Sequence, residues 1–75
     1  MQNTMKFAVA RMLGDDVTIL KLFDEDRKEE AMAYGQQAAK GYNTGLICVI
    51  KAAFTPEGER ADNRYRLYEA YERNA

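Results

Sequence analysis

The sequence predicts an α+β domain with the chain order strand, strand, helix, strand, strand, in which a four-stranded antiparallel sheet carries the helix on one face. Three observations predict this fold. Residues 45–54 form a nearly unbroken apolar run rich in β-branched residues, which is typical of a central strand. Residues 5–13 form a second run that is apolar on both faces. Between them, residues 24–40 repeat small and aromatic residues at helical spacing.

The length of 75 residues allows one small domain over 1–75, in which residues 1–4 and 72–75 are expected to fray. A chain this short buries only about 60% of the surface that its unfolded form exposes, so dimerisation is a common source of added stability. Cys48 is the only cysteine and there is no histidine, which excludes an internal disulfide and a Cys/His zinc site. We therefore expect no metal and no other cofactor.

Charge and hydropathy narrow the class of protein further. The formal net charge is −1, whereas a general nucleic-acid binder normally has a basic excess. No apolar run reaches the roughly 18 to 20 residues of a membrane span, and residues 1–6 lack the apolar core of a signal peptide. We expect a cytoplasmic protein with no membrane partner, in which Cys48 is a reduced and buried thiol.

The first half of the chain predicts a hairpin. Residues 5–13 form its first strand, and residues 17–23, which begin with β-branched side chains, form its second. The connection between them, Gly-Asp-Asp at 14–16, is a turn and makes the two strands antiparallel. In a strand, the adjacent carboxylates of Asp15 and Asp16 would project to opposite sides and could not bind one metal ion together. We therefore interpret both as turn residues.

Asp24 is expected to cap the helix, which runs to about Lys40 and ends at a left-handed Gly41. Acidic Glu25 and Asp26 follow the cap, where the helix dipole favours negative charge. The residues expected to face the sheet share one helical stripe: Ala31, Tyr34, Gly35, Ala38 and Tyr42. Small residues in this stripe allow the helix axis to approach the sheet closely.

The second half of the chain also predicts a hairpin. After the strand at 45–54, Pro56 and Gly58 indicate a turn that extends to about residue 63. Residues 64–71 then form the last strand, because tyrosines favour β structure and the glycine weakens a helix. The alternative is a helix within 56–73, with proline in its first turn.

Two strand orders make every neighbouring pair antiparallel. Order 2-1-3-4 is preferred over 1-2-4-3, because it places the two strands that are apolar on both faces in the centre of the sheet. Charged residues in 64–71 are typical of an edge strand, where they discourage unwanted pairing.

One helix covers only one face of this sheet, although residues 45–54 offer apolar side chains to both. Cys48 and Ile50 share one face, and Ile47 and Val49 share the other. A bare apolar face is unusual in a monomer, so we expect a homodimer or another protein to cover it. We assign Ile47 and Val49 to this partner-binding surface, although the pattern does not decide which face the helix leaves uncovered.

No catalytic residues are assigned. The absence of histidine excludes histidine-based catalysis, and the glycines lack the spacing of a phosphate-binding loop. We therefore expect a non-catalytic interaction module rather than an enzyme.

The most distinctive cluster is Arg64, Tyr65, Arg66 and Tyr68. A solvent-exposed edge strand with aromatic cross-strand packing is the preferred interpretation of these residues, and a binding surface is the alternative. Arginine and tyrosine are enriched at the energetic centres of protein interfaces, which favours a protein partner. The alternative is a nucleic-acid-binding regulator, in which arginines hold phosphates and tyrosines stack on bases. This alternative is disfavoured because four glutamates are interspersed with the cluster, at positions 57, 59, 69 and 72.

Overall fold

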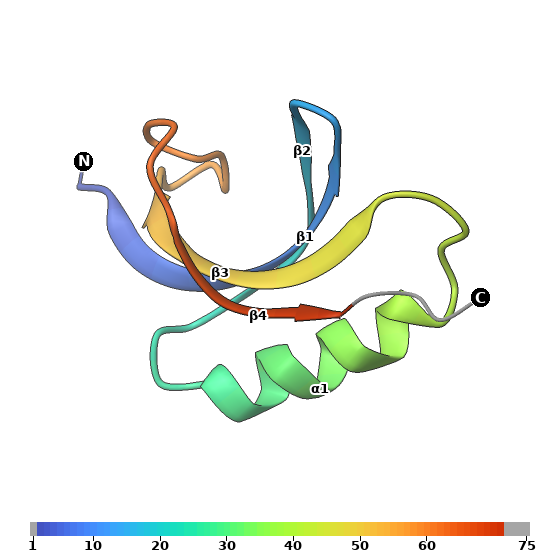
Figure 1. The fold of residues 1–75 in the computed structure, drawn as a ribbon. Helices are drawn as coiled ribbons and strands as arrows, with labels where there is room; N and C mark the ends of the chain where they lie inside the picture. Colours follow the sequence, from blue (N-terminus) through green and yellow to red (C-terminus); the bar gives the residue numbers. More distant parts are fainter. Residues whose placement is uncertain (1, 72–75) are drawn as a thin grey trace.

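Four antiparallel strands form one curved sheet, and a single helix lies against one of its faces (Figure 1). The computed structural model describes residues 2–71. In chain order the elements are β1 (Thr4–Leu13), β2 (Asp16–Phe23), α1 (Lys28–Ala39), β3 (Leu46–Phe54) and β4 (Arg66–Tyr71). The sheet order is β2-β1-β3-β4, which confirms the predicted α+β fold and the preferred order 2-1-3-4. The alternative order 1-2-4-3 is wrong.

The helix begins later than its predicted cap. Asp24 lies in a turn, where its carbonyl accepts a hydrogen bond from the Arg27 amide at 2.9 Å. The Asp24 carboxylate binds the Lys6 ammonium at 3.1 Å instead of an amide of the first helical turn. Arg27 stands at the cap position of α1 with no side-chain capping bond. The prediction that Asp24 caps the helix is therefore wrong, because an ion pair to β1 engages its carboxylate.

The turns use glycine in two of the three predicted places. Gly14 has φ 61° between β1 and β2, and Gly58 has φ 90° between β3 and β4, as predicted. Gly41 does not adopt a positive φ, so the predicted left-handed helix end is wrong. The positive φ falls instead on Gly45, at 85°, immediately before β3.

The C-terminal segment is a strand, as predicted, and not a helix. The turn that follows β3 is closed by a hydrogen bond from the Gly58 amide to the Thr55 carbonyl at 2.9 Å. β4 then begins at Arg66, two residues later than predicted, and lies at the edge of the sheet.

The core on the helix side is formed by β1, β3 and α1. Its buried members are Phe7, Val9, Ala31, Ile47 and Val49. Gly35 of α1 is buried as well, so the predicted stripe of small residues does face the sheet. Because Gly35 and Ala31 are small, this part of the helix approaches the sheet closely.

The opposite face of the sheet is buried too, which corrects the expectation that it is bare. Its buried residues come from β1 and β3: Ala8, Ala10, Cys48, Ile50, Ala52 and Phe54. Side chains of β2 and β4 pack against them, among them Ile19, Leu22 and Ala70. The chain therefore covers its own helix-free face without a partner.

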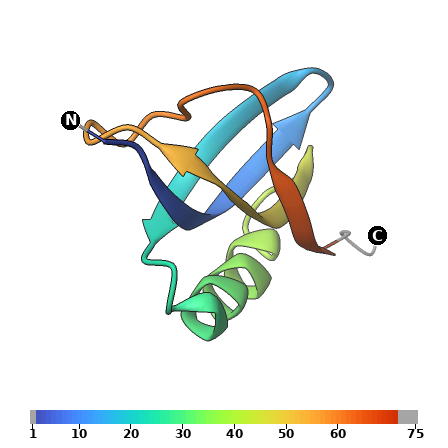
Figure 2. The ribbon, with the colours of Figure 1, turned by 90° about the vertical axis from the view of Figure 1, so that its left-hand side faces the viewer.

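The curvature of the sheet explains how side chains of β2 and β4 cover the helix-free face. The ladder shifts register at Val9/Ala10 in the β1–β2 pair and at Val49/Ile50 in the β3–β4 pair. Such irregularities bend a sheet and increase its twist. In Figures 1 and 2 the β1–β2 hairpin and the segment after β3 both rise on the side opposite α1. This brings Gly58 close to β2, where a Cβ added to the glycine would lie 3.5 Å from Leu22 Cδ1.

Candidate partner-binding site

Two of the predicted partner-binding residues belong to the core. Ile47 is 2% exposed and Val49 is fully buried, and both lie beneath α1 beside Phe7 and Val9. They are on the face that the helix covers, so neither offers a surface to a partner in this structure. Their burial stabilises the packing of α1 on the sheet.

Tyr68 has a mixed role. Its ring packs edge-on against Phe7, with centroids 5.1 Å apart and planes at 78°, so one side of the tyrosine belongs to the helix-side core. Two cations flank the ring, with Lys28 Nζ 5.2 Å and Arg66 Cζ 5.0 Å from its centroid. The half-buried Tyr68 ring therefore makes its contacts within the domain and offers little surface to a partner.

A bulge in β4 decides which side chains reach each face. Val49 pairs with Glu69 and Ile50 pairs with Leu67, which leaves Tyr68 as the extra residue between them. Strict alternation along a strand would place Tyr68 on the same face as Ala70. Instead Tyr68 packs on the α1 side together with Tyr71, and Ala70 packs on the opposite side.

The remaining three predicted residues stand in an exposed segment where the β3–β4 ladder is interrupted. The ladder ends at the pair Lys51–Arg66, and the next backbone bond runs from the Ala61 amide to the Ala53 carbonyl at 2.8 Å. Residues 62–65 bend outward between these two points. Asp62 shapes this bend, since its carboxylate accepts a hydrogen bond from the Arg64 amide at 2.9 Å.

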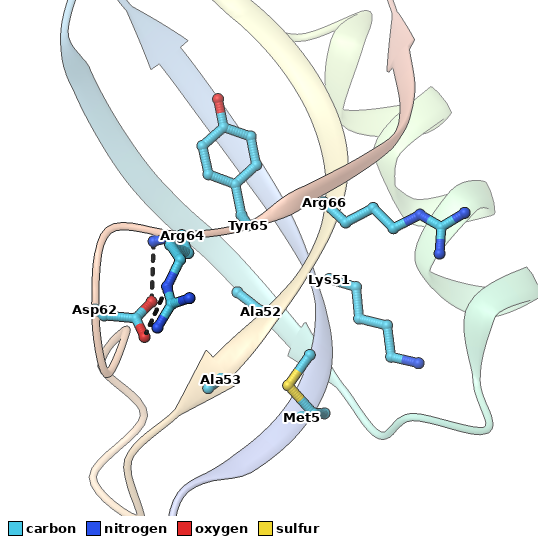
Figure 3. A pocket seen from close by; sticks show the side chains of 8 residues that line it. All are labelled: Met5, Lys51, Ala52, Ala53, Asp62, Arg64, Tyr65 and Arg66. Carbon is cyan, nitrogen blue, oxygen red and sulfur yellow. Dashed lines mark hydrogen bonds and ion pairs between the residues drawn. The ribbon is translucent and has the colours of Figure 1, made fainter.

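This interruption opens a pocket of about 330 Å³ between β1, β3 and the outward bend (Figure 3). Its apolar lining comes from Met5, Ala52, Ala53 and Tyr65. A volume of this size lies at the small end of ligand-binding sites in proteins. Met5 and Tyr65 are both exposed, so the apolar lining is open to solvent.

Three cations and one carboxylate also line the pocket. Lys51 bonds to Glu25 at 2.8 Å, which raises the pKa of the lysine above its ordinary value. Arg64 has an 89% exposed side chain and approaches Asp62 only at 3.9 Å. Arg66 makes no ion pair within residues 2–71 and lies over the Tyr68 ring.

The cations are distributed on two sides of the opening. In Figure 3, Arg64 is turned toward Asp62 on one side, whereas Arg66 and Lys51 extend together on the other. The arrangement can hold an anionic group at each side and an apolar group between them. We call the exposed residues Arg64, Tyr65, Arg66 and Leu67 the β4 strip.

Sequence reasoning found the cations of the β4 strip but missed the pocket. Met5, Lys51 and Ala53 were assigned only to strands. The one available signal was the pair of small residues Ala52-Ala53 near the end of an otherwise bulky strand. The outward bend that opens the pocket depends on where the ladder is interrupted, which residue types alone do not reveal.

The described chain offers little for covalent or metal chemistry. Within residues 2–71 no group of three or more His, Cys, Asp or Glu side chains is placed to hold a metal ion. Burial raises the pKa of the Cys48 thiol, which keeps it in the unreactive protonated form. No helix in the described part of the chain is long and apolar enough to cross a membrane.

Comparisons of the chain with known protein families, with curated proteins and with solved structures gave no match.

Proposed function

We propose that this chain is a non-catalytic interaction module of the cytoplasm that binds a protein partner through the β4 strip. The observation that carries the proposal is the exposure of two large apolar side chains beside two arginines on one edge of the sheet. Tyr65 is 43% exposed and Leu67 is 52% exposed, and both border Arg66 in the sequence. Arginine and tyrosine are the residue types that contribute most at the centres of protein interfaces.

The partner is a different protein rather than a second copy. A homodimer was expected on the helix-free face, but that face is filled by side chains of β2 and β4. Pairing of two β4 edges is opposed by the bulge at Tyr68, since bulges and charged residues on edge strands hinder strand addition. We therefore expect the partner to contact side chains of the β4 strip rather than to pair with the β4 backbone.

Single-stranded nucleic acid is the second candidate, favoured by one observation. The exposed Tyr65 lies beside the pocket cations Lys51, Arg64 and Arg66, so a base and its phosphates have groups of the required kinds. A protein partner is preferred because Asp62 also lines the pocket and Glu25 binds Lys51. Both carboxylates repel a continuous polyanion.

Site-specific photo-crosslinking tests the proposal. A photoreactive phenylalanine at position 65 should crosslink a partner in cells, whereas the same residue at the exposed Glu29 of α1 should not. The crosslinked protein is then purified and titrated directly. Leu67→Ser should weaken binding about tenfold, because Leu67 is exposed in the free chain and would be buried in the complex. Equal crosslinking from position 29, or unchanged affinity of Leu67→Ser, overturns the proposal.

A further inference from the structure

We infer that the pocket beside the β4 strip binds an extended acidic segment of the partner, with one apolar side chain in the pocket and carboxylates on Arg64 and Arg66. The inference rests on the proposed function and names the chemistry of the partner. Three features support it: the apolar lining of the pocket, the position of the cations around it, and the carboxylates that oppose a nucleic acid.

The apolar lining fits an aliphatic side chain. Met5, Ala52 and Ala53 present methyl and thioether groups. Tyr65 lines the pocket as well, although its ring points away from Met5 in Figure 3. The Tyr65 hydroxyl lies 3.8 Å from Met12 Sδ, so the ring is directed toward a residue outside the pocket lining. An apolar group that enters displaces water from these surfaces, which is favourable.

The cations determine what must flank that side chain. Arg64 lies on one side of the opening, and Arg66 lies on the other beside Lys51 (Figure 3). Arg64 has one distant carboxylate neighbour, at 3.9 Å, and the described chain gives Arg66 none. Both guanidinium groups are therefore free to form charge-assisted, bidentate bonds with carboxylates of an extended segment.

A peptide suits this site better than a nucleic acid because its charges can be spaced. Phosphates recur at every nucleotide and would meet Asp62, and Glu25 on Lys51, as well as the arginines. The pocket lining also lacks a second aromatic residue on which a base could stack. The Tyr68 ring does not serve, because it is half-buried against Phe7 and flanked by Lys28 and Arg66. An acidic segment places its carboxylates only where the cations are.

Fluorescence polarisation with a labelled peptide, Gly-Glu-Ser-Leu-Ser-Glu-Gly, tests the inference, because in an extended segment its two carboxylates flank the leucine on the same side. The parent protein should bind it saturably, and binding should weaken as salt rises. Replacing the peptide leucine by serine should weaken binding about tenfold, because the pocket then receives a polar group.

Matched variants of the protein locate the site. Arg64→Gln should weaken peptide binding about fivefold, the upper end for an exposed ion pair, and Ala53→Leu should weaken it further by filling the pocket. Lys40→Gln removes the same charge at the end of α1 and should leave the affinity unchanged within about twofold. Circular dichroism confirms that each variant is folded.

Three results overturn the inference: no saturable binding of the peptide, equal affinity of Arg64→Gln and the parent, or tighter binding of a labelled oligothymidylate than of the peptide. These results are distinguishable from failure of the proposed function. A crosslinked partner whose binding depends on Leu67, together with absent peptide binding, removes the acidic segment and retains the interaction module.

Discussion

Gly35 of α1 lies directly against Tyr71 of β4: a Cβ added to the glycine would be 2.8 Å from Tyr71 Cε2. The same added atom would lie 3.2 Å from Val49 Cγ2 of β3. The tyrosine ring is anchored, because its hydroxyl donates a hydrogen bond to the Met32 carbonyl at 3.0 Å. The missing side chain of Gly35 therefore sets the distance between helix and sheet.

Gly35→Leu should destabilise the protein by about 1 to 3 kcal/mol, because overpacking must push α1 away from β3 and β4. The loss should occur although leucine has the higher helix propensity. Gln36→Leu is the matched control on the exposed side of α1 and should change the free energy of unfolding by less than about 0.5 kcal/mol. Chemical denaturation of both variants measures these differences. Equal stability of Gly35→Leu and the parent would show that the helix face is assigned wrongly.

Combining Gly35→Leu with Tyr71→Ala tests whether the tyrosine ring causes this cost. Removing the ring opens the space that the leucine needs, so the two substitutions should not be additive. The double variant should be about 0.5 to 3 kcal/mol more stable than the sum of the single changes predicts. Additivity would mean that the leucine clashes elsewhere, for example with Val49.

Tyr71→Phe should cost about 1 kcal/mol at neutral pH, since it removes the hydrogen bond to the Met32 carbonyl. Burial and the charge of Glu69 raise the pKa of Tyr71 in the folded protein. The stabilisation of the neutral phenol is therefore fully present below the unfolded pKa of about 10, and is lost as pH rises through the folded pKa.

The pH dependence of unfolding distinguishes this effect. The parent should lose stability more steeply than Tyr71→Phe above pH about 9, because only the parent carries this shifted phenol. Denaturant titrations at several alkaline pH values give both slopes. Identical slopes would mean that Tyr71 titrates equally in the folded and unfolded chain.

Gly45→Ala should be more costly than Gly14→Ala. Both glycines have positive φ, so alanine is strained by about 1 kcal/mol at either position. At Gly45 the added Cβ would also lie 3.0 Å from Arg11 Nε and 3.1 Å from the Met12 carbonyl oxygen. At Gly14 nothing lies within 4 Å. We expect a loss of about 2 kcal/mol or more for Gly45→Ala by thermal or chemical denaturation, and equal losses would contradict the close approach.

Cys48 should not react with thiol reagents in the folded protein. Its side chain is fully buried, its Sγ lies 3.7 Å from the Ala10 carbonyl oxygen, and burial raises its pKa. Reaction with a chromogenic disulfide should therefore follow global unfolding, with a rate that rises with denaturant. Fast reaction in buffer alone would show that the helix-free face opens locally.

The sequence was sufficient for the order of elements because hydropathy periods and turn residues act locally. The run 45–54 is apolar on both faces and does lie in the centre of the sheet, and the small residues of α1 do face it. The predicted cap at Asp24 was wrong because its carboxylate binds Lys6, which lies far away in the sequence, and the helix begins later.

The candidate site was less predictable because it depends on curvature and on ladder irregularities. A single bulge moves Tyr68 to the helix side, so counting alternate residues gives the wrong face from that point on. Curvature also closes the helix-free face, which a flat sheet would have left bare. Neither feature has a residue signature as clear as a turn glycine, and both follow from packing across the whole sheet.

The most direct test of the central claim is the mass of the protein in solution, measured by size-exclusion chromatography with light scattering. If the chain fills its own helix-free face and a different protein binds the β4 strip, the purified chain has no surface for self-association. The purified parent should be a monomer of 8.6 kDa at about 10 and about 300 μM alike. A dimer of twice that mass at the lower concentration, unchanged by Leu67→Ser, would show that another face carries the association and would contradict the account.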